Sequence, residues 1–157
     1  MSFNEPDQSS QSNLSPTDAA SGYMTYMQPF AGKAKLGSPA ITNGGGSMGL
    51  SWLSSFMTAC SGCQIDFVPI HWYSNNADDF ITHVQAAYAQ TGKPIWITEF
   101  ALTGATDAQV EAFMATVTAW MDTTDYVHRY AYFMASQGSL INSAGTGLSA
   151  IGSAFAS

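Results

Sequence analysis

Two glutamates occupy positions where a carboxylate could take part in a reaction. Glu99 lies near the end of an apolar stretch at 94–100, and Glu5 lies near the start of the chain, directly before Pro6. A carboxylate in a buried strand is costly unless it has a partner or a function. Hydrolysis of a glycosidic bond uses two carboxylates, one as acid and base and the other as nucleophile. The pair therefore suggests chemistry on a sugar.

Aromatic and polar residues near the ends of other predicted strands could bind such a substrate. One strand ends in His71, Trp72 and Tyr73, and two others carry Asn43 and Phe133 at or near their ends. Flat apolar sugar faces stack on aromatic rings much as other apolar surfaces do. Packing in the core is an equally good explanation of the three consecutive rings, so both alternatives stay open.

The sequence gives no signal for a metal or a cofactor. His71, His83 and His128 share no metal-ligand spacing. The glycines at 44–46 match neither the dinucleotide-binding nor the P-loop fingerprint, and a flexible loop explains them. We therefore expect a reaction that needs neither a metal ion nor a cofactor.

Net charge narrows the choice of partner. Four Lys and Arg stand against eleven Asp and Glu, a net charge of −7. Nucleic acid and anionic lipid both require clustered cations, so neither is expected as a partner. No apolar run of about 18 residues is present, so no membrane span is expected either. A neutral polymer fits the charge better.

The polar residues of the chain are mostly uncharged, which suits a secreted protein. Charged residues make up only 10% of the chain, well below the usual quarter, so the surface depends on Ser, Thr, Asn, Gln and Gly. No charged and then apolar leader precedes Glu5, so a secretion signal would lie upstream of this chain. We expect an extracellular or cell-wall location.

Cys60 and Cys63 form a C-x-x-C pair that has several interpretations. The spacing suits a redox motif or half of a zinc site, but the chain has no second pair. The pair lies at the end of a predicted helix, whereas thiolates are activated at helix starts. A local disulfide formed in an oxidising compartment is favoured over free thiols.

Strand-like and helix-like patterns alternate along the chain. Strands are predicted near 2–5 and at 35–42, 65–73, 94–100 and 127–134, and helices at about 16–27, 53–60, 76–90, 107–121 and 149–156. This alternation predicts an α/β fold with a parallel sheet, either a doubly wound sheet or a (β/α) barrel. The candidate polar residues all fall near the C-terminal ends of strands, which form one shared rim in a barrel. The barrel is therefore favoured.

Three strand-end motifs together resemble glycoside hydrolase family 128, a family of small endo-β-1,3-glucanases with retaining (β/α)8 barrels. They are the stretches Phe3–Asp7, Ile70–Tyr73 and Trp96–Phe100. The resemblance runs essentially from Ser2 to the C-terminus. It implies a β-glucan polysaccharide or oligosaccharide as the substrate.

The resemblance also implies roles for individual residues. Glu5 corresponds to the acid and base at the end of strand four, and Glu99 to the nucleophile at the end of strand seven. Asn4 corresponds to the hydrogen-bond partner of the sugar 2-hydroxyl. No cofactor is implied.

Only about strands four to eight of such a barrel are expected in 157 residues. A complete barrel takes about 250 residues, so the chain is expected to be a single catalytic-core domain, 1–157, that is truncated at its N-terminus. Unpaired strand edges would then favour self-association. The alternative to an enzyme is a non-catalytic carbohydrate-binding cell-wall protein or a truncated pseudoenzyme.

Overall fold

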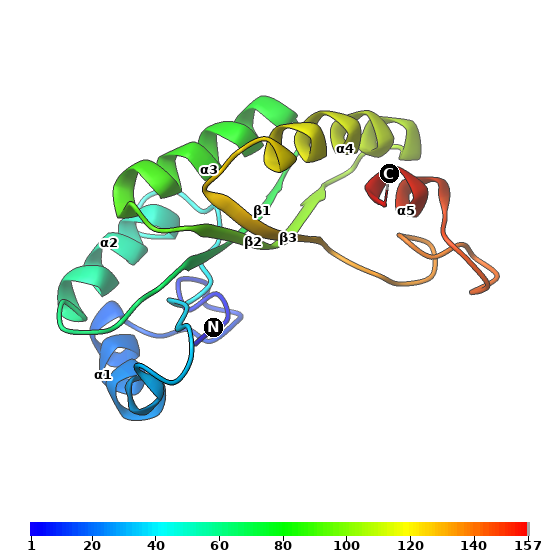
Figure 1. The fold of residues 1–157 in the computed structure, drawn as a ribbon. Helices are drawn as coiled ribbons and strands as arrows, with labels where there is room; N and C mark the ends of the chain where they lie inside the picture. Colours follow the sequence, from blue (N-terminus) through cyan, green and yellow to red (C-terminus); the bar gives the residue numbers. More distant parts are fainter. Residues whose placement is uncertain (157) are drawn as a thin grey trace.

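The computed structural model describes residues 1–156 and centres them on a three-stranded parallel sheet (Figure 1). Its strands are β1 (Val68–Ser74), β2 (Ile95–Leu102) and β3 (Val127–Tyr132), in that order across the sheet. Helix α3 (Ala77–Thr91) joins β1 to β2, and helix α4 (Asp107–Asp122) joins β2 to β3. The predicted α/β fold with a parallel sheet is confirmed.

Two earlier segments extend this sheet through single bridges. Segment 37–41 makes parallel bridges to Phe67, directly before β1, and to Ile70 within β1, and Asn4 makes a parallel bridge to Ala40. Proline in the middle of segment 37–41 removes a backbone donor, which prevents a continuous ladder. The first two predicted strands are therefore present only as isolated bridges.

The remaining helices lie toward the two ends of the chain. They are α1 (Pro16–Tyr26), the 3-10 helix η1 (Gln28–Phe30), α2 (Gly49–Ala59) and α5 (Ala150–Phe155). All five α-helices of residues 1–156 were predicted from the sequence. Within residues 1–156, none of the helices has the length and apolar character needed to cross a membrane.

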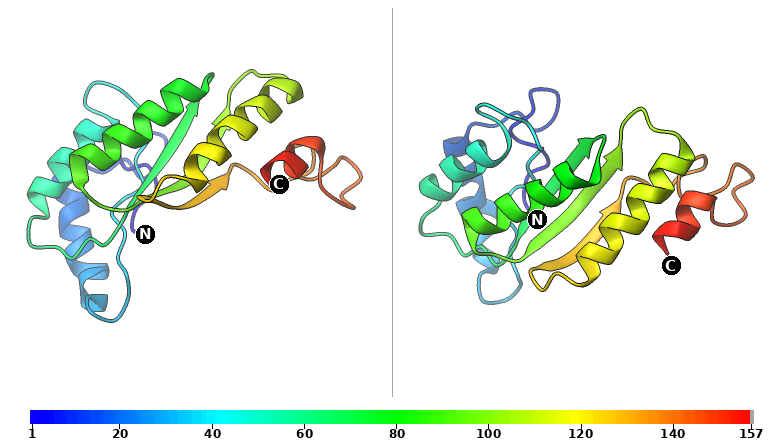
Figure 2. Two further views of the ribbon diagram at one scale, coloured as in Figure 1. Left: turned by 45° about the horizontal axis from the view of Figure 1, so that its top comes forward. Right: turned by 90° about the horizontal axis from the view of Figure 1, so that it is seen from above.

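Helices α2, α3 and α4 lie on the same side of the sheet (Figures 1 and 2). The bridged segments and the three strands follow one another across the sheet in chain order. A doubly wound sheet reverses its strand order at a switch point and carries helices on both faces. Neither feature occurs in the part of the chain that the structure describes.

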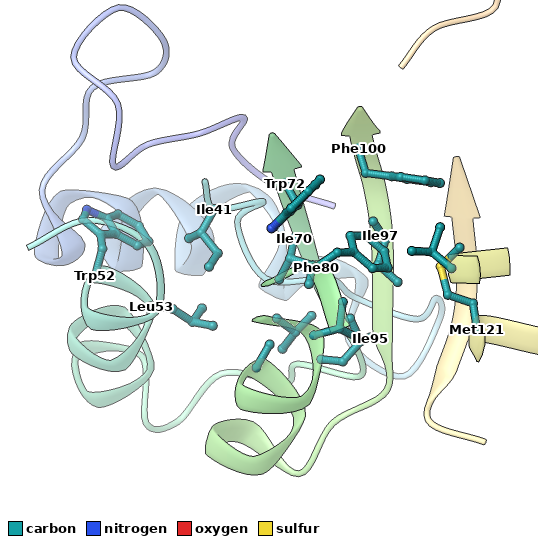
Figure 3. Packing of buried hydrophobic residues seen from close by; sticks show 14 of the residues in the cluster. Ile41, Trp52, Leu53, Ile70, Trp72, Phe80, Ile95, Ile97, Phe100 and Met121 are labelled. Carbon is teal, nitrogen blue, oxygen red and sulfur yellow. The ribbon is translucent and has the colours of Figure 1, made fainter. Parts of the chain in front are cut away.

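The core fills the space between the sheet and these helices (Figure 3). Helices contribute Leu53, Phe80 and Met121, and the strands contribute isoleucines and aromatic rings at alternate positions. These side chains are all almost fully buried. Their packing fixes which face of each strand is turned away from the helices.

No helix covers the opposite face of the sheet within residues 1–156 (Figure 1). On that face Phe67 stacks on Trp96 with their ring centroids 3.8 Å apart. The guanidinium carbon of Arg129 lies 4.8 Å from the Trp96 ring, at the distance of a cation–π contact. We call this surface the open face.

Cys60 and Cys63 form a disulfide directly after α2, and their Cα atoms are 5.3 Å apart. The predicted local disulfide is confirmed. It closes the turn that leads from α2 toward β1.

Candidate active site

Glu5, His71 and Glu99 meet at the C-terminal ends of the strands. Nδ1 of His71 lies 2.9 Å from Oε1 of Glu5 and 3.6 Å from Oε2 of Glu99. The ligand atoms of the three side chains all lie within 4.8 Å of one another. Glu5 and Glu99, which are 94 positions apart in the sequence, therefore form one carboxylate pair with an imidazole between them.

A register shift turns Glu99 toward this cluster. Ile95 and Ile97 on β2 face the helices, and strict alternation would send Glu99 to the same side. Beyond Ile97, however, the partner of His71 on β1 is Glu99, which leaves Thr98 as an extra residue. A β-bulge of this kind re-aims the side chain that follows it. Glu99 consequently lies beside His71 instead of in the core.

The backbone conformation of Glu5 and the hydrogen bonds of the nearby Asp7 carboxylate hold Glu5 in place. Its φ angle is +40°, a left-handed value that is rare for a residue other than glycine, and its backbone N–H donates to the carbonyl of Ala40 at 2.8 Å. Two residues later, Asp7 accepts hydrogen bonds from the backbone and hydroxyl of Thr42 and from the backbone N–H of Gly49. These contacts tie the Glu5 loop to the neighbouring segment and to the start of α2.

Tyr73 contacts the second carboxylate directly. Its hydroxyl donates a hydrogen bond to Oε2 of Glu99 at 2.7 Å. Burial, followed by the hydrogen bond to Glu99, raises the pKa of Tyr73 well above its ordinary value. The phenol therefore remains a donor at any physiological pH. The sequence indicates Tyr73 only as an aromatic surface, because no local pattern links its hydroxyl to Glu99, 26 positions away.

Asn43 and Phe133 surround Tyr73. The side-chain amide of Asn43 donates to the Tyr73 carbonyl at 3.1 Å and accepts from the Tyr73 N–H at 3.2 Å. The ring of Phe133 meets the Tyr73 ring edge to face at 6.0 Å, and Phe133 is exposed. Asn43 thus clamps the end of β1, whereas Phe133 presents apolar surface at the rim.

The predicted sugar platform at the end of β1 needs a correction. Trp72 is 1% exposed because its ring points to the helix side and packs against Phe80 and Phe113. No face of Trp72 remains for a sugar, so its predicted role in substrate binding is wrong. His71 is 2% exposed and likewise offers no stacking surface, although its ring nitrogen reaches both carboxylates.

Asn4 lies beside the cluster but outside its contacts. Its side chain is exposed, and the amide donates to Oε1 of Gln11 at 3.2 Å. The backbone carbonyl of Asn4 accepts from the hydroxyl and N–H of Ser12. The strand end before Glu5 is therefore fixed by its backbone, while the amide remains accessible.

The cluster also has the donor set of a cation site. One imidazole nitrogen and two carboxylate oxygens converge, and no local spacing of histidines in the sequence signals this. The ion pairs found in residues 1–156 give neither carboxylate a lysine or arginine partner. The arrangement can thus support either acid–base chemistry or metal binding.

Residues 1–155 match the protein family described as the glycosyl hydrolase catalytic core. Alkali-sensitive linkage protein 1 of Schizosaccharomyces pombe is 37% identical over 179 aligned residues, which cover 100% of this chain and 32% of that protein. The chain thus spans about a third of the length of this curated relative.

Solved structures with the same fold include an enzyme and a binding protein. A curdlan-specific exo-β-1,3-glucanase of family 128 from Blastomyces gilchristii, solved with glucose, is 42% identical with a TM-score of 0.89. The alignment covers 98% of this chain and 67% of that one. A family 128 oligosaccharide-binding protein from Cryptococcus neoformans is 27% identical with a TM-score of 0.83, over 98% of this chain and 64% of that one.

Proposed function

Because the chain belongs to the glycosyl hydrolase catalytic core family and to glycoside hydrolase family 128, we propose that it hydrolyses β-1,3-glucan with retention of anomeric configuration. The observation that carries this proposal is the separation of the two carboxylates. One oxygen of Glu5 and one of Glu99 lie within 4.8 Å of each other. Retaining glycosidases hold their carboxyl groups about 5–5.5 Å apart, whereas inverting ones leave about 6.5–9.5 Å for a water molecule.

In the proposed mechanism Glu5 is the acid and base, and Glu99 is the nucleophile. Glu5 gives a proton to the leaving glycosidic oxygen while a Glu99 oxygen attacks the anomeric carbon. Glu5 then takes a proton from water, which displaces Glu99 from the glycosyl ester and restores both side chains. Two displacements at one carbon return the original configuration.

Neighbouring residues would orient these two groups. Tyr73 directs its hydroxyl to Glu99, and an N–H on Nδ1 of His71 would fix the Glu5 oxygen at 2.9 Å. We assign Asn4 to the sugar 2-hydroxyl, since its amide is exposed next to Glu5. The exposed Phe133 and the half-buried Tyr73 remain candidates for stacking on a sugar ring.

The proposed fold is the strand 4 to 8 portion of a (β/α)8 barrel in one domain, 1–157. Two observations support this fold. The strands follow one another across the sheet in chain order, with helices on one side. The structure also matches that of an enzyme with a TM-score of 0.89, and the alignment covers 67% of that enzyme. The glucan substrate and an extracellular or cell-wall location are parts of the same proposal. The relatives' names and the low fraction of charged residues support them.

The first experiment is hydrolysis of laminarin oligosaccharides by the 157-residue chain, with proton NMR of the first anomer released. We expect the β anomer from the unaltered chain and at least about 1000-fold less turnover in Glu5→Gln and Glu99→Gln. Glu111→Gln is the matched control, because Glu111 is the third glutamate of the chain and lies on α4. Release of the α anomer first would overturn the retaining mechanism.

The roles of the two carboxylates can then be distinguished with a substrate that has a different leaving group. On an aryl β-glucoside whose leaving group needs little protonation, Glu5→Ala should keep its first step, whereas Glu99→Ala should lose it. Equal losses in both variants on this substrate would contradict the assignment of Glu5 as the acid.

Oligosaccharide binding without hydrolysis is the second candidate function. The family 128 binding protein from Cryptococcus neoformans supports it, because that fold covers 98% of this chain. Binding to insoluble β-1,3-glucan that is unchanged in Glu5→Gln and Glu99→Gln, with no turnover, would favour this alternative.

Self-association through the edge of the sheet is a further part of the proposal. β2 occupies one edge of β3, and no strand of residues 1–156 pairs with the other edge. Unpaired N–H and C=O groups at such an edge accept another chain. Sedimentation velocity should show dimers or larger species whose proportion rises with concentration, and a monomer at all concentrations would contradict this.

A further inference from the structure

We infer that Glu5, His71 and Glu99 form a binding site for one divalent transition-metal ion, and that the ion excludes the sugar reaction. The metal site stands on the geometry of the cluster, while the exclusion of the reaction rests on the proposed function.

The distances in the cluster suit a small cation. An ion bound at about 2.0–2.2 Å separates its own ligand atoms by roughly 3–4.5 Å, depending on the angle between the bonds. Here Nδ1 of His71 is 2.9 Å from Glu5 and 3.6 Å from Glu99, and all three ligand atoms lie within 4.8 Å. A small movement of the two carboxylates is enough to bring all three ligand atoms to bonding distance from one ion.

The charge of the cluster also favours a cation. Two carboxylates face one imidazole, and no lysine or arginine of residues 1–156 pairs with either of them. Two neighbouring negative charges in a low-dielectric site repel each other, and a dication would neutralise both.

The ligand types select transition metals over magnesium and calcium. Mg²⁺ and Ca²⁺ prefer oxygen ligands alone, whereas imidazole nitrogen suits Zn²⁺ and Cu²⁺. The affinity expected for a mixed nitrogen and oxygen site rises from Mn²⁺ through Co²⁺ to Cu²⁺, and Zn²⁺ binds less tightly than Cu²⁺. The neutral His71 ring must carry its proton on Nε2 for Nδ1 to bind the ion.

The surroundings preorganise the ligands and leave a fourth position open. The side chain of His71 is 2% exposed and thus held by the core, and the Tyr73 hydroxyl orients Glu99 through a contact of 2.7 Å. The side chain of Glu99 is 26% exposed, so water can reach the ion from the solvent side. Three protein ligands and one water make a common zinc geometry.

An ion in this position would block hydrolysis by a direct competition for lone pairs. Glu99 needs a free oxygen to attack the anomeric carbon, and Glu5 needs one to carry the proton. Each of these oxygens would be a ligand of the ion. Binding of Zn²⁺ and hydrolysis of the glycosidic bond would therefore exclude each other.

The test is calorimetric titration of the EDTA-treated, dialysed chain with ZnCl₂, MgCl₂ and CaCl₂, with CoCl₂ absorbance as a second readout. We expect one Zn²⁺ per chain and visible d–d bands from bound Co²⁺, with no comparable site for Mg²⁺ or Ca²⁺. Equal affinity for Mg²⁺ and Zn²⁺, or no stoichiometric site for Zn²⁺, would overturn the inference.

Single substitutions test which side chains bind the ion. Glu99→Gln keeps the shape of the side chain and should weaken Zn²⁺ binding by about 10-fold or more, as should His71→Gln if that variant folds. His128→Gln is the matched control, since His128 is exposed on β3. If Glu99→Gln left binding unchanged and His128→Gln abolished it, the ion would lie elsewhere and the inference would be wrong.

Hydrolysis in EDTA separates this inference from the proposed function. Stoichiometric Zn²⁺ binding without hydrolysis would support the metal site and contradict the enzyme. Hydrolysis in EDTA without Zn²⁺ binding would support the enzyme and overturn the metal site. Hydrolysis that continues undiminished with Zn²⁺ bound would overturn the mutual exclusion.

Discussion

The hydroxyl of Tyr73 donates a hydrogen bond of 2.7 Å to Oε2 of Glu99, which links the ends of β1 and β2 beyond the register shift. A hydrogen bond to a charged acceptor is shorter and stronger than one between neutral groups. This contact therefore sets the orientation of the proposed nucleophile.

Removal of this hydroxyl should affect turnover more than stability. Tyr73→Phe loses a hydrogen bond worth about 1.5–3 kcal/mol to a charged partner, so we expect kcat on laminarin oligosaccharides to fall roughly 10- to 100-fold. Tyr130→Phe is the control, because its hydroxyl donates to Asp122 away from the site. Equal kcat values in both variants would contradict an orienting role for Tyr73.

Asp7 should stabilise the segment that carries Glu5. In Asp7→Asn one acceptor oxygen becomes an NH₂ group that faces the donors of Thr42 and Gly49. We expect the free energy of unfolding in urea to fall by about 1.5–3 kcal/mol, with a lower kcat. The exposed Asp125 supplies the control Asp125→Asn, which should change neither quantity, and a similar loss in both variants would contradict the anchor.

His83 should make the protein less stable in acid. Burial lowers the pKa of His83 to about 4, and its Nε2 has no hydrogen-bond partner among the described residues. The unfolded chain binds this proton near pH 6.5, so its contribution to stability is complete above pH 6.5 and is lost as the pH falls toward 4. The loss should reach roughly 2–3 kcal/mol.

Urea unfolding at pH 7 and pH 4.5 measures this effect. The difference between the two pH values should shrink in His83→Leu and persist in His128→Gln, since His128 is exposed. An unchanged difference in His83→Leu would assign the acid sensitivity to another group.

The disulfide should add a modest amount of stability. Cys60 and Cys63 are separated by three positions, and closure of so short a loop contributes about 2 kcal/mol in the chain-entropy model. A reducing agent should therefore lower the urea midpoint of the unaltered chain. The double variant Cys60→Ala, Cys63→Ser should show no response to the reductant, and a chain that is equally stable in both conditions would contradict the prediction.

Local patterns in the sequence were enough to predict most of the secondary structure. Ser15 and Thr106 cap their helices through the predicted side-chain contacts, and Gly92 ends α3 in a left-handed conformation. Caps and apolar periodicity depend on residues only a few positions apart, so one stretch of sequence contains all the information. The parallel sheet followed from the alternation of such stretches.

Residue types near strand ends also identified several members of the cluster. Glu99 was conspicuous because a carboxylate in an apolar stretch is costly, and Glu5 because it lies where an apolar residue gives way to a turn at Pro6. Both signals are properties of the local sequence. Trp72 shows the limit of this reasoning. The side to which its ring points depends on the alternation of β1 against α3 and α4, and there the ring is buried in the core.

Only the tertiary structure decided how the cluster is assembled. Regular alternation on β2 would have placed Glu99 beside Ile95 and Ile97 against the helices, and the extra residue Thr98 reverses this. The bulge depends on pairing with β1, and the contact between Glu5 and His71 joins positions 66 residues apart. Such contacts arise from packing between segments that do not influence each other locally. The sequence by itself determined which carboxylates exist and near which strand ends they lie, and the pairing of those strands determined that they meet around His71.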